Sequence, residues 1–150
     1  MRTDSIIENE FIFLRSLQSA DASLEYLSWL SDTTINAFLE IRFNVPDSLD
    51  ELEEFIVRHE KSLDYLLMGI FLKKNDLHIG NIKLGPINLH HKIADIGFLI
   101  GDKKQWGNGY AYQAITLISE YGFRELGLEK ITAGVYAANK GSQKALLKAG

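Results

Sequence analysis

The first third of the chain combines an apolar run with regularly spaced leucines. Residues 11–17, FIFLRSL, are apolar and prone to β structure, which predicts the first strand. Leu24, Leu27 and Leu30 then recur every three residues, a spacing that predicts an amphipathic helix. Residues 33–46 are ambiguous, and a short helix followed by a loop fits them.

A second helix is predicted from residue 48 onward by a capping signal and an apolar face. Ser48 is followed three residues later by Glu51, which is the spacing of a capping box. In this motif the two side chains satisfy free amides at the start of a helix. The apolar residues that follow share one helical face: Leu49, Leu52, Phe55, Ile56 and Leu63.

Strand patterns dominate the middle of the chain. Residues 65–73 and 77–85 are apolar runs that flank the turn sequence KND, which predicts a β-hairpin. After a second turn-like segment, residues 93–101, IADIGFLIG, predict a further strand.

The last third of the chain predicts one β-loop-α-β unit. Residues 111–126 predict a helix, which Gly127 ends in the left-handed position that glycine favours. The apolar face of this helix comprises Ala111, Ala114, Ile115, Ile118, Tyr121 and Gly122. Residues 130–137, KITAGVYA, predict another strand, and residues 142–150 begin a last helix. The order β, α, α, β, β, β, α, β, α predicts a single mixed α/β (α+β) domain over residues 1–150.

The composition agrees with one globular domain. The chain has 150 residues, of which 46% are hydrophobic, and it contains no long linker or internal repeat. Its net charge of -4 disfavours a nucleic-acid surface, which normally carries a basic stripe. Because the chain has no cysteine, disulfides, zinc–thiolate sites and a thiol nucleophile are excluded.

The N-terminal sequence does not resemble a secretion signal. The first ten residues, MRTDSIIENE, are too polar for the apolar region of a signal peptide. No apolar run approaches the length that spans a bilayer. We therefore expect a soluble cytoplasmic protein that binds neither membranes nor nucleic acid.

Two glycines stand at the start of the helix that follows the predicted strand at residues 93–101. The segment KKQWGNGYAYQA places Gly107 and Gly109 one residue apart, where free amides and the helix dipole favour a phosphate group. A Walker A loop would need Lys-Ser/Thr where Tyr110 and Ala111 stand. A dinucleotide-binding fingerprint would need glycine in place of Tyr112 and an acidic residue after the next strand. Both motifs fail, and a tight loop without a ligand is the structural alternative.

The segment WGNGYA, residues 106–111, resembles the acyl-CoA pyrophosphate loop of the GNAT acetyltransferases, Gln/Arg-x-x-Gly-x-Gly/Ala, with Trp106 in place of Gln or Arg. The preceding ADIGFLI, residues 94–100, is similar to the family's strand before this loop. The later LEKITAGVYAANKGSQKALLKAG is similar to its next strand and helix, with an Asn-x-x-Ser signature at Asn139 and Ser142. Together these motifs resemble the ribosomal-protein alanine N-acetyltransferase-like branch, strongly over the second half of the chain and in element order over the first.

The resemblance implies the GNAT fold, in which helices flank a central mixed, mostly antiparallel sheet and strands 93–101 and 130–137 splay apart. It also implies acetyl-CoA as the co-substrate and no metal. The first of these strands would pair with the pantetheine arm, and the amide of Leu99 or Ile100 would stabilise the oxyanion. The implied acetyl-CoA site comprises Phe98, Leu99, Ile100, Gln105, Trp106, Gly107, Asn108, Gly109, Tyr110, Ala111 and Asn139.

The implied reaction is direct attack of a primary amine on the acetyl thioester in a ternary complex. Asp95 stands where this branch often carries a glutamate and is the candidate base, with a solvent-facing strand residue as the alternative. Many GNAT enzymes carry a tyrosine acid seven residues after the asparagine, and Leu146 stands there. Ser142 is therefore the candidate for proton transfer to the thiol, and it also suits a helix N-cap.

The implied acceptor site lies between the first two helices. Its candidate residues are Trp29, Phe38, Glu40 and Arg42, and packing explains the aromatic residues equally well. Acceptors in this branch include protein N-termini, other small-molecule or peptide amines and amino sugars, and the sequence does not choose among them. His90 and His91 adjoin each other in a turn without ligand partners, which disfavours a metal site. A homodimer is compatible with the sequence.

Two further functions fit part of the pattern. A non-catalytic regulatory domain that binds acyl-CoA would keep the glycine pair and could lack the tyrosine acid. A different nucleotide-binding domain is the second alternative. The family pattern continues past Gly150 with more strands, so we expect a longer natural chain, or a partner that covers the strand edge at residues 130–137.

Overall fold

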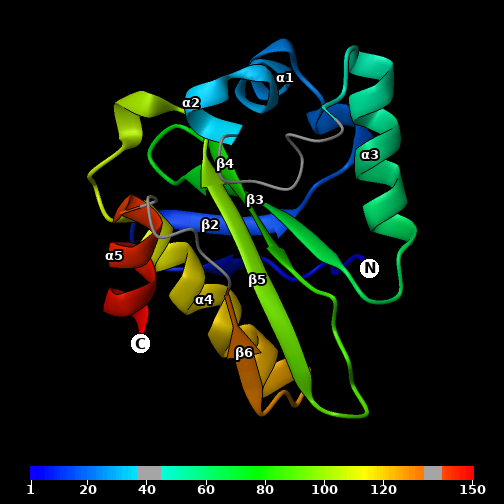
Figure 1. Ribbon diagram of the computed structural model, residues 1–150, viewed down its shortest axis with the longest axis vertical. Coiled ribbons are helices and arrows are strands. Elements are labelled where there is room, and N and C mark those ends of the chain that lie inside the picture. The colour runs from blue at the N-terminus through cyan, green and yellow to red at the C-terminus, as the bar shows by residue number, and fades with distance from the viewer. Residues whose placement is uncertain (37–44, 134–139) are drawn as a thin grey trace.

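The computed structural model describes residues 1–36, 45–133 and 140–150. Its centre is a six-stranded sheet whose strands lie side by side in chain order, with helices on both faces (Figure 1). The strands are β1 (Ile7–Glu8), β2 (Ile12–Ser16), β3 (Leu66–Leu72), β4 (His78–Leu84), β5 (Ile93–Ile100) and β6 (Lys130–Thr132). The helices are η1 (Ser19–Asp21), α1 (Leu24–Ser31), α2 (Thr33–Asn36), α3 (Leu49–Lys61), η3 (Lys103–Gln105), α4 (Tyr110–Glu125) and α5 (Lys140–Ala149). The predicted mixed α/β class is confirmed.

The sheet is antiparallel from β1 to β5, whereas β5 and β6 run parallel, so the predicted mostly antiparallel sheet is confirmed. β6 pairs with β5 only at Ile93, Ala94 and Asp95. Residues 96–100 of β5 continue beyond this pairing and pair with β4. In the described part of the chain, the last five residues of β5 therefore have a strand partner on one edge only.

Strand alternation divides the apolar side chains between two cores. On β3, Leu66, Met68 and Ile70 face α4, whose buried side chains include Ile115 and Ile118. The intervening β3 residues face a second core, which α1 and α3 cover. This second core comprises Leu17, Tyr26, Trp29, Leu30, Leu52, Ile56, Leu67 and Phe71. The two cores pack the sheet between helices on both of its faces (Figure 1).

The predicted helix start at Ser48 is confirmed. Its Oγ accepts a hydrogen bond from the Glu51 amide at 3.2 Å, while the Glu51 carboxylate accepts one from the Asp47 amide at 2.6 Å. The expectation for Leu63 is wrong, because α3 ends at Lys61 and the Leu63 side chain is 90% exposed.

Other element boundaries also differ from the expectations. α5 begins at Lys140, so Ser142 lies inside the first turn instead of capping the helix. β1 was not predicted, because it contains only two residues. Residues 134–137 of the last predicted strand lie outside the described residues.

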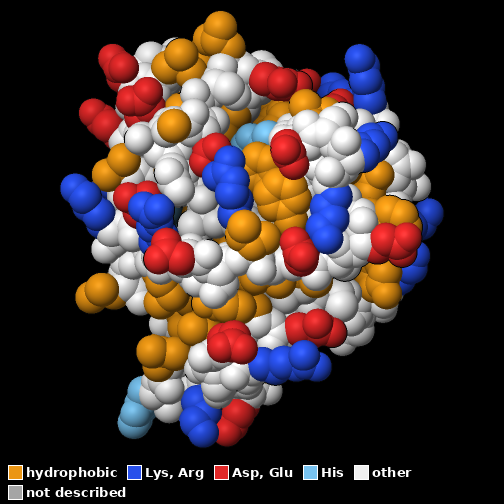
Figure 2. Space-filling model, turned by 180° about the vertical axis from the view of Figure 1, so that it is seen from behind, with side chains coloured by type: hydrophobic (Ala, Val, Ile, Leu, Met, Phe, Trp, Pro, Cys, Tyr) orange, Lys and Arg blue, Asp and Glu red, His pale blue; other side chains and the backbone are white. Residues whose placement is uncertain are grey.

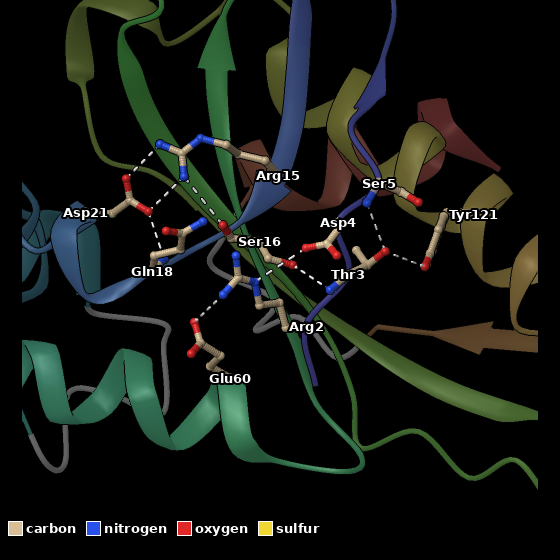
Figure 3. Close-up of polar contacts among 10 residues, drawn as sticks. All are labelled: Arg2, Thr3, Asp4, Ser5, Arg15, Ser16, Gln18, Asp21, Glu60 and Tyr121. Atoms are coloured by element: carbon tan, nitrogen blue, oxygen red, sulfur yellow. Dashed lines mark hydrogen bonds and ion pairs between the residues drawn. The ribbon is translucent and has the colours of Figure 1, made fainter.

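The N-terminal segment connects three elements through polar contacts (Figure 3). The Thr3 amide donates to Ser16 Oγ on β2 at 3.0 Å, and the Tyr121 hydroxyl on α4 donates to Thr3 Oγ1 at 3.2 Å. Arg2 lies 3.8 Å from the carboxylate of Glu60 on α3. Residues at the start of the chain therefore join the sheet to a helix on each of its faces.

The charged side chains are of mixed sign on the face seen in Figure 2. Acidic and basic side chains are interspersed there around a central group of hydrophobic side chains. Within residues 1–36, 45–133 and 140–150, no helix is both long enough and apolar enough to cross a bilayer.

Candidate active site

The turn before α4 has the left-handed backbone that the two glycines allow. Gly107 and Gly109 both have φ of 79°, and Gly109 is the residue before the first turn of α4. A Cβ on either glycine would have no other atom within 4 Å. The glycines are therefore required by backbone conformation and not by crowding.

The amides of this turn form no hydrogen bonds within the described part of the chain. Trp106 N still donates to Lys103 O, and Gln113 N is the next amide with an acceptor, Gly109 O. The six amides of residues 107–112 lie between these two and have no side-chain cap. Lys148 of α5 adds a positive charge nearby, since its Nζ lies 4.6 Å from the centre of the Tyr112 ring. This arrangement favours an anion at the start of α4.

The backbone of β5 presents alternate residues to its two edges. Gly85 N donates to Asp95 O and Gly101 N donates to Ile79 O, both at 2.8 Å, so the odd-numbered residues of β5 face β4. Because these directions alternate in an antiparallel pair, the backbone groups of Phe98 and Ile100 point to the opposite edge. The Leu99 amide faces β4.

Trp106 connects this edge to the turn. Its indole Nε1 donates a hydrogen bond to Ile100 O at 2.7 Å. Lys103, in the intervening η3 helix, forms an ion pair with Asp32 at 2.9 Å. Hydrogen bonds from Thr34 and Lys103 lower the pKa of Asp32 to about 2. The turn is thus tied both to the end of β5 and to the end of α1.

Asp95 lies on the exposed surface of β5, on the face opposite α4. Its carboxylate accepts a hydrogen bond from the Thr132 hydroxyl of β6. The next residue on this face, Gly97, leaves open space, since a Cβ there would have no neighbour within 4 Å. Asp95 therefore borders a position, Gly97, where the described residues leave the surface of the sheet uncovered.

The second half of the predicted site is only partly described. Ser142 lies in the first turn of α5 and is half-buried, and α5 packs against α4. Leu146, at the position of the family's tyrosine, packs against the core on the α4 side. Asn139 lies outside the described residues.

Of the four predicted acceptor residues, only Trp29 lies within the described part of the chain. Trp29 is 5% exposed and packs beside Tyr26 at a ring-centroid distance of 5.8 Å. Phe38, Glu40 and Arg42 lie outside the described residues. Among the described residues, no group of three His, Asp or Glu side chains could hold a metal ion.

A polar pair that the sequence did not predict lies beneath α1. His78 Nε2 lies 2.8 Å from Asn81 Oδ1. Ile70 pairs with Gly80 and Phe71 pairs with His78, so a β-bulge at Ile79 brings residues 78 and 81 to one face. Simple strand alternation puts positions 78 and 81 on opposite faces, so no sequence signal predicts the pair.

This pair is enclosed by aromatic side chains. The His78 ring stacks on Phe71 at 4.8 Å and meets the edges of Tyr26 and Trp29. Burial lowers the pKa of His78, despite the opposing hydrogen bond with Asn81. Asn81 is 4% exposed, and its Nδ2 has no hydrogen-bond partner among the described residues.

Among the described residues, an open strand edge thus lies beside a turn that favours an anion. The profile of the family described as "Acetyltransferase (GNAT) domain" matches residues 12–150. The chain belongs to this family and is an acetyltransferase.

Individual relatives agree with this assignment. The probable N-acetyltransferase YjcK of Bacillus subtilis is 33% identical over 97% of this chain and 82% of its own length. A spermidine N-acetyltransferase from Vibrio cholerae, solved with CoA and spermine, superposes with a TM-score of 0.81 at 24% identity, over 95% of this chain and 81% of its own. A putative ribosomal-protein-serine acetyltransferase from Vibrio cholerae superposes with a TM-score of 0.79 at 22% identity, over 100% and 84%.

Proposed function

We propose that this chain is an acetyl-CoA-dependent N-acetyltransferase that acetylates a primary amine, within the ribosomal-protein acetyltransferase-like branch. The observation that carries the proposal is the row of six amides, residues 107–112, that lack acceptors in the described part of the chain beside the free edge of β5. The CoA bound to the Vibrio cholerae spermidine enzyme supports the same carrier here. The acceptor of this chain is a protein N-terminus, a small amine or an amino sugar.

Acetyl-CoA supplies the acetyl group as a thioester, and it carries a diphosphate whose charge suits the turn. The amides of residues 107–111 hold this diphosphate, with Gln105 and Trp106 beside it. The backbone groups of Phe98 pair with the pantetheine arm, because they face the free edge. Asn139 donates a further hydrogen bond to that arm.

The reacting atoms meet at β5. The Ile100 amide stabilises negative charge on the thioester oxygen. The Leu99 amide is the weaker candidate for this role, because it faces β4 and not the free edge. The acceptor nitrogen forms a bond to the acetyl carbon, and the carbon–sulfur bond breaks with its electron pair leaving on sulfur. Asp95 removes a proton from the nitrogen, directly or through water, and Ser142 delivers a proton to sulfur. The Thr132 hydroxyl orients the Asp95 carboxylate.

Calorimetric titration with CoA, followed by an acetyl transfer assay, tests this function. The panel of acceptors contains a peptide with a free N-terminus, a polyamine and a nucleotide-linked amino sugar. We expect saturable CoA binding and release of one free thiol for each acetylated amine of at least one acceptor class. Binding without acetylated product would instead indicate a regulatory acyl-CoA-binding domain, and absence of binding would contradict the site itself.

A further inference from the structure

Both tryptophans of the chain contact the end of β5, from different sides. Trp29 packs over Gly101 on the α1 face of the sheet. Trp106 approaches along the free edge, where its indole nitrogen donates to the Ile100 carbonyl at 2.7 Å. The strand end is therefore held by one aromatic side chain on its face and by another on its edge.

Core packing does not explain Trp106. Its side chain is 49% exposed, and it belongs to neither of the two apolar cores. Its polar atom is the part of the side chain with a defined partner. The hydrogen bond to Ile100 is therefore the specific polar contact of a ring that is only half-buried.

The Ile100 carbonyl is the group on which an added strand would otherwise pair. It points away from β4, as does the backbone of Phe98. With the indole bound to it, this carbonyl is already satisfied. The backbone groups of Phe98 and the amide of Ile100 remain among the groups that the free edge offers to an extended ligand.

We propose that Trp106 is a positioning residue that fixes the end of β5 against the turn at residues 107–111, so that the Ile100 amide meets the thioester oxygen. This inference rests on the proposed function and assigns Trp106 a role beyond contact with the diphosphate. The indole acts through Ile100, because its hydrogen bond restrains the peptide that follows the reacting amide.

Trp106→Phe tests the role, because it keeps an aromatic ring and removes the donor. Phe123→Leu is the matched control, since Phe123 is 46% exposed and lies near the far end of α4. We expect Trp106→Phe to lower kcat with acetyl-CoA roughly three- to tenfold, the effect of one lost hydrogen bond, while the melting temperature falls by no more than about 4 °C. Phe123→Leu leaves kcat unchanged.

The kinetic parameters separate this role from simple ligand contact. A rise in KM for acetyl-CoA with unchanged kcat would mean that Trp106 only binds the carrier, which overturns the inference. Equal kinetics of Trp106→Phe and the unaltered protein would overturn it as well. An unaltered protein that neither binds CoA nor transfers acetyl groups contradicts the proposed function, and this inference falls with it.

A measurement on the unaltered protein makes the test independent of how the variant folds. The indole N–H of Trp106 gives its own signal in a nitrogen–proton NMR spectrum, and Trp106→Phe assigns it. We expect this proton to stay protected from exchange when CoA saturates the protein. Loss of protection would show that the ligand displaces the indole from Ile100, and the positioning role would be refuted.

Discussion

Trp29 and Gly101 are in direct contact, and the contact leaves no room for a side chain at position 101. A Cβ atom on Gly101 would lie 2.0 Å from Cδ2 of the Trp29 indole. This places α1, which borders the predicted acceptor site, directly on the end of β5. Trp29 thus acts first as a packing residue, the alternative that the sequence left open.

Gly101→Ala should destabilise the protein for this reason. The added methyl group must displace the buried Trp29 ring, and such overpacking costs about 1–3 kcal/mol in the free energy of unfolding. Gly97→Ala on the same strand is the control, because a Cβ there meets no atom within 4 Å. Its effect should stay within about 0.5 kcal/mol. Urea denaturation of the two variants compares them, and equal losses would contradict the contact.

Gly109→Ala should weaken CoA binding more than stability alone explains. Gly109 and Gly127 have φ of 79° and 66°, and both have open space at Cβ. Alanine at either position costs roughly 1–2 kcal/mol of backbone strain. Only Gly109 belongs to the turn with the bare amides, and backbone strain there shifts an amide away from the bound anion. Loss of one charge-assisted hydrogen bond should raise the Kd for CoA at least about tenfold for Gly109→Ala, as measured by calorimetry. Equal Kd values for the two variants would remove the turn from the binding site.

Asp95→Asn should slow acetyl transfer and leave CoA binding intact. The amide keeps the shape of the side chain but cannot accept a proton, and loss of a general base costs roughly 10²- to 10⁴-fold in kcat. Single-turnover rates with the preferred amine measure the effect, and calorimetry checks CoA binding. A variant with the kcat and pH–rate profile of the unaltered protein would show that Asp95 is an ordinary surface residue.

His78 should make the fold less stable as the pH falls. Burial holds the pKa of His78 below its ordinary value of 6.5, and among the nearby charges Asp21 opposes the shift while Arg15 adds to it. Below about pH 6.5 the unfolded chain therefore binds this proton more readily than the folded chain. The free energy of unfolding should decrease as the pH falls from 6.5 through the lower folded-state pKa.

His78→Gln isolates this contribution, because glutamine can still donate to Asn81 but does not titrate. Chemical denaturation between about pH 7.5 and 5 should show a shallower loss of stability for His78→Gln than for the unaltered protein. A loss remains, because burial also lowers the pKa of His59. His90→Gln, on an exposed turn, is the control. The same pH dependence in both variants would contradict a role for His78.

Local patterns predicted most of the fold. The hairpin of β3 and β4 follows from two apolar runs around KND, and the start of α3 follows from Ser48 and Glu51. Leu63 was misplaced because apolar spacing does not reveal where a helix ends. The two residues of β1 are too few for any periodicity, and their strand conformation depends on pairing with β2.

The part of the candidate site that depends on local backbone conformation, the turn before α4, was predictable from its glycine motif. The glycine pair predicted the bare amides before α4. The His78–Asn81 pair depends on a bulge between strands, and the Trp106–Ile100 hydrogen bond depends on which edge of β5 faces outward. Both are consequences of strand register, which a single sequence does not specify. The roles of Asp95 and Ser142 stay predictions.

The free edge of β5 also links the affinity for the ligand to the free energy of unfolding of the protein. A thioester carrier lying along residues 96–100 would form a further rung of the sheet, and it would be absent from the denatured chain. Mass action then adds about 2.7 kcal/mol of stability when the free carrier exceeds its dissociation constant a hundredfold. The melting temperature of the protein would therefore rise with the concentration of free acetyl donor.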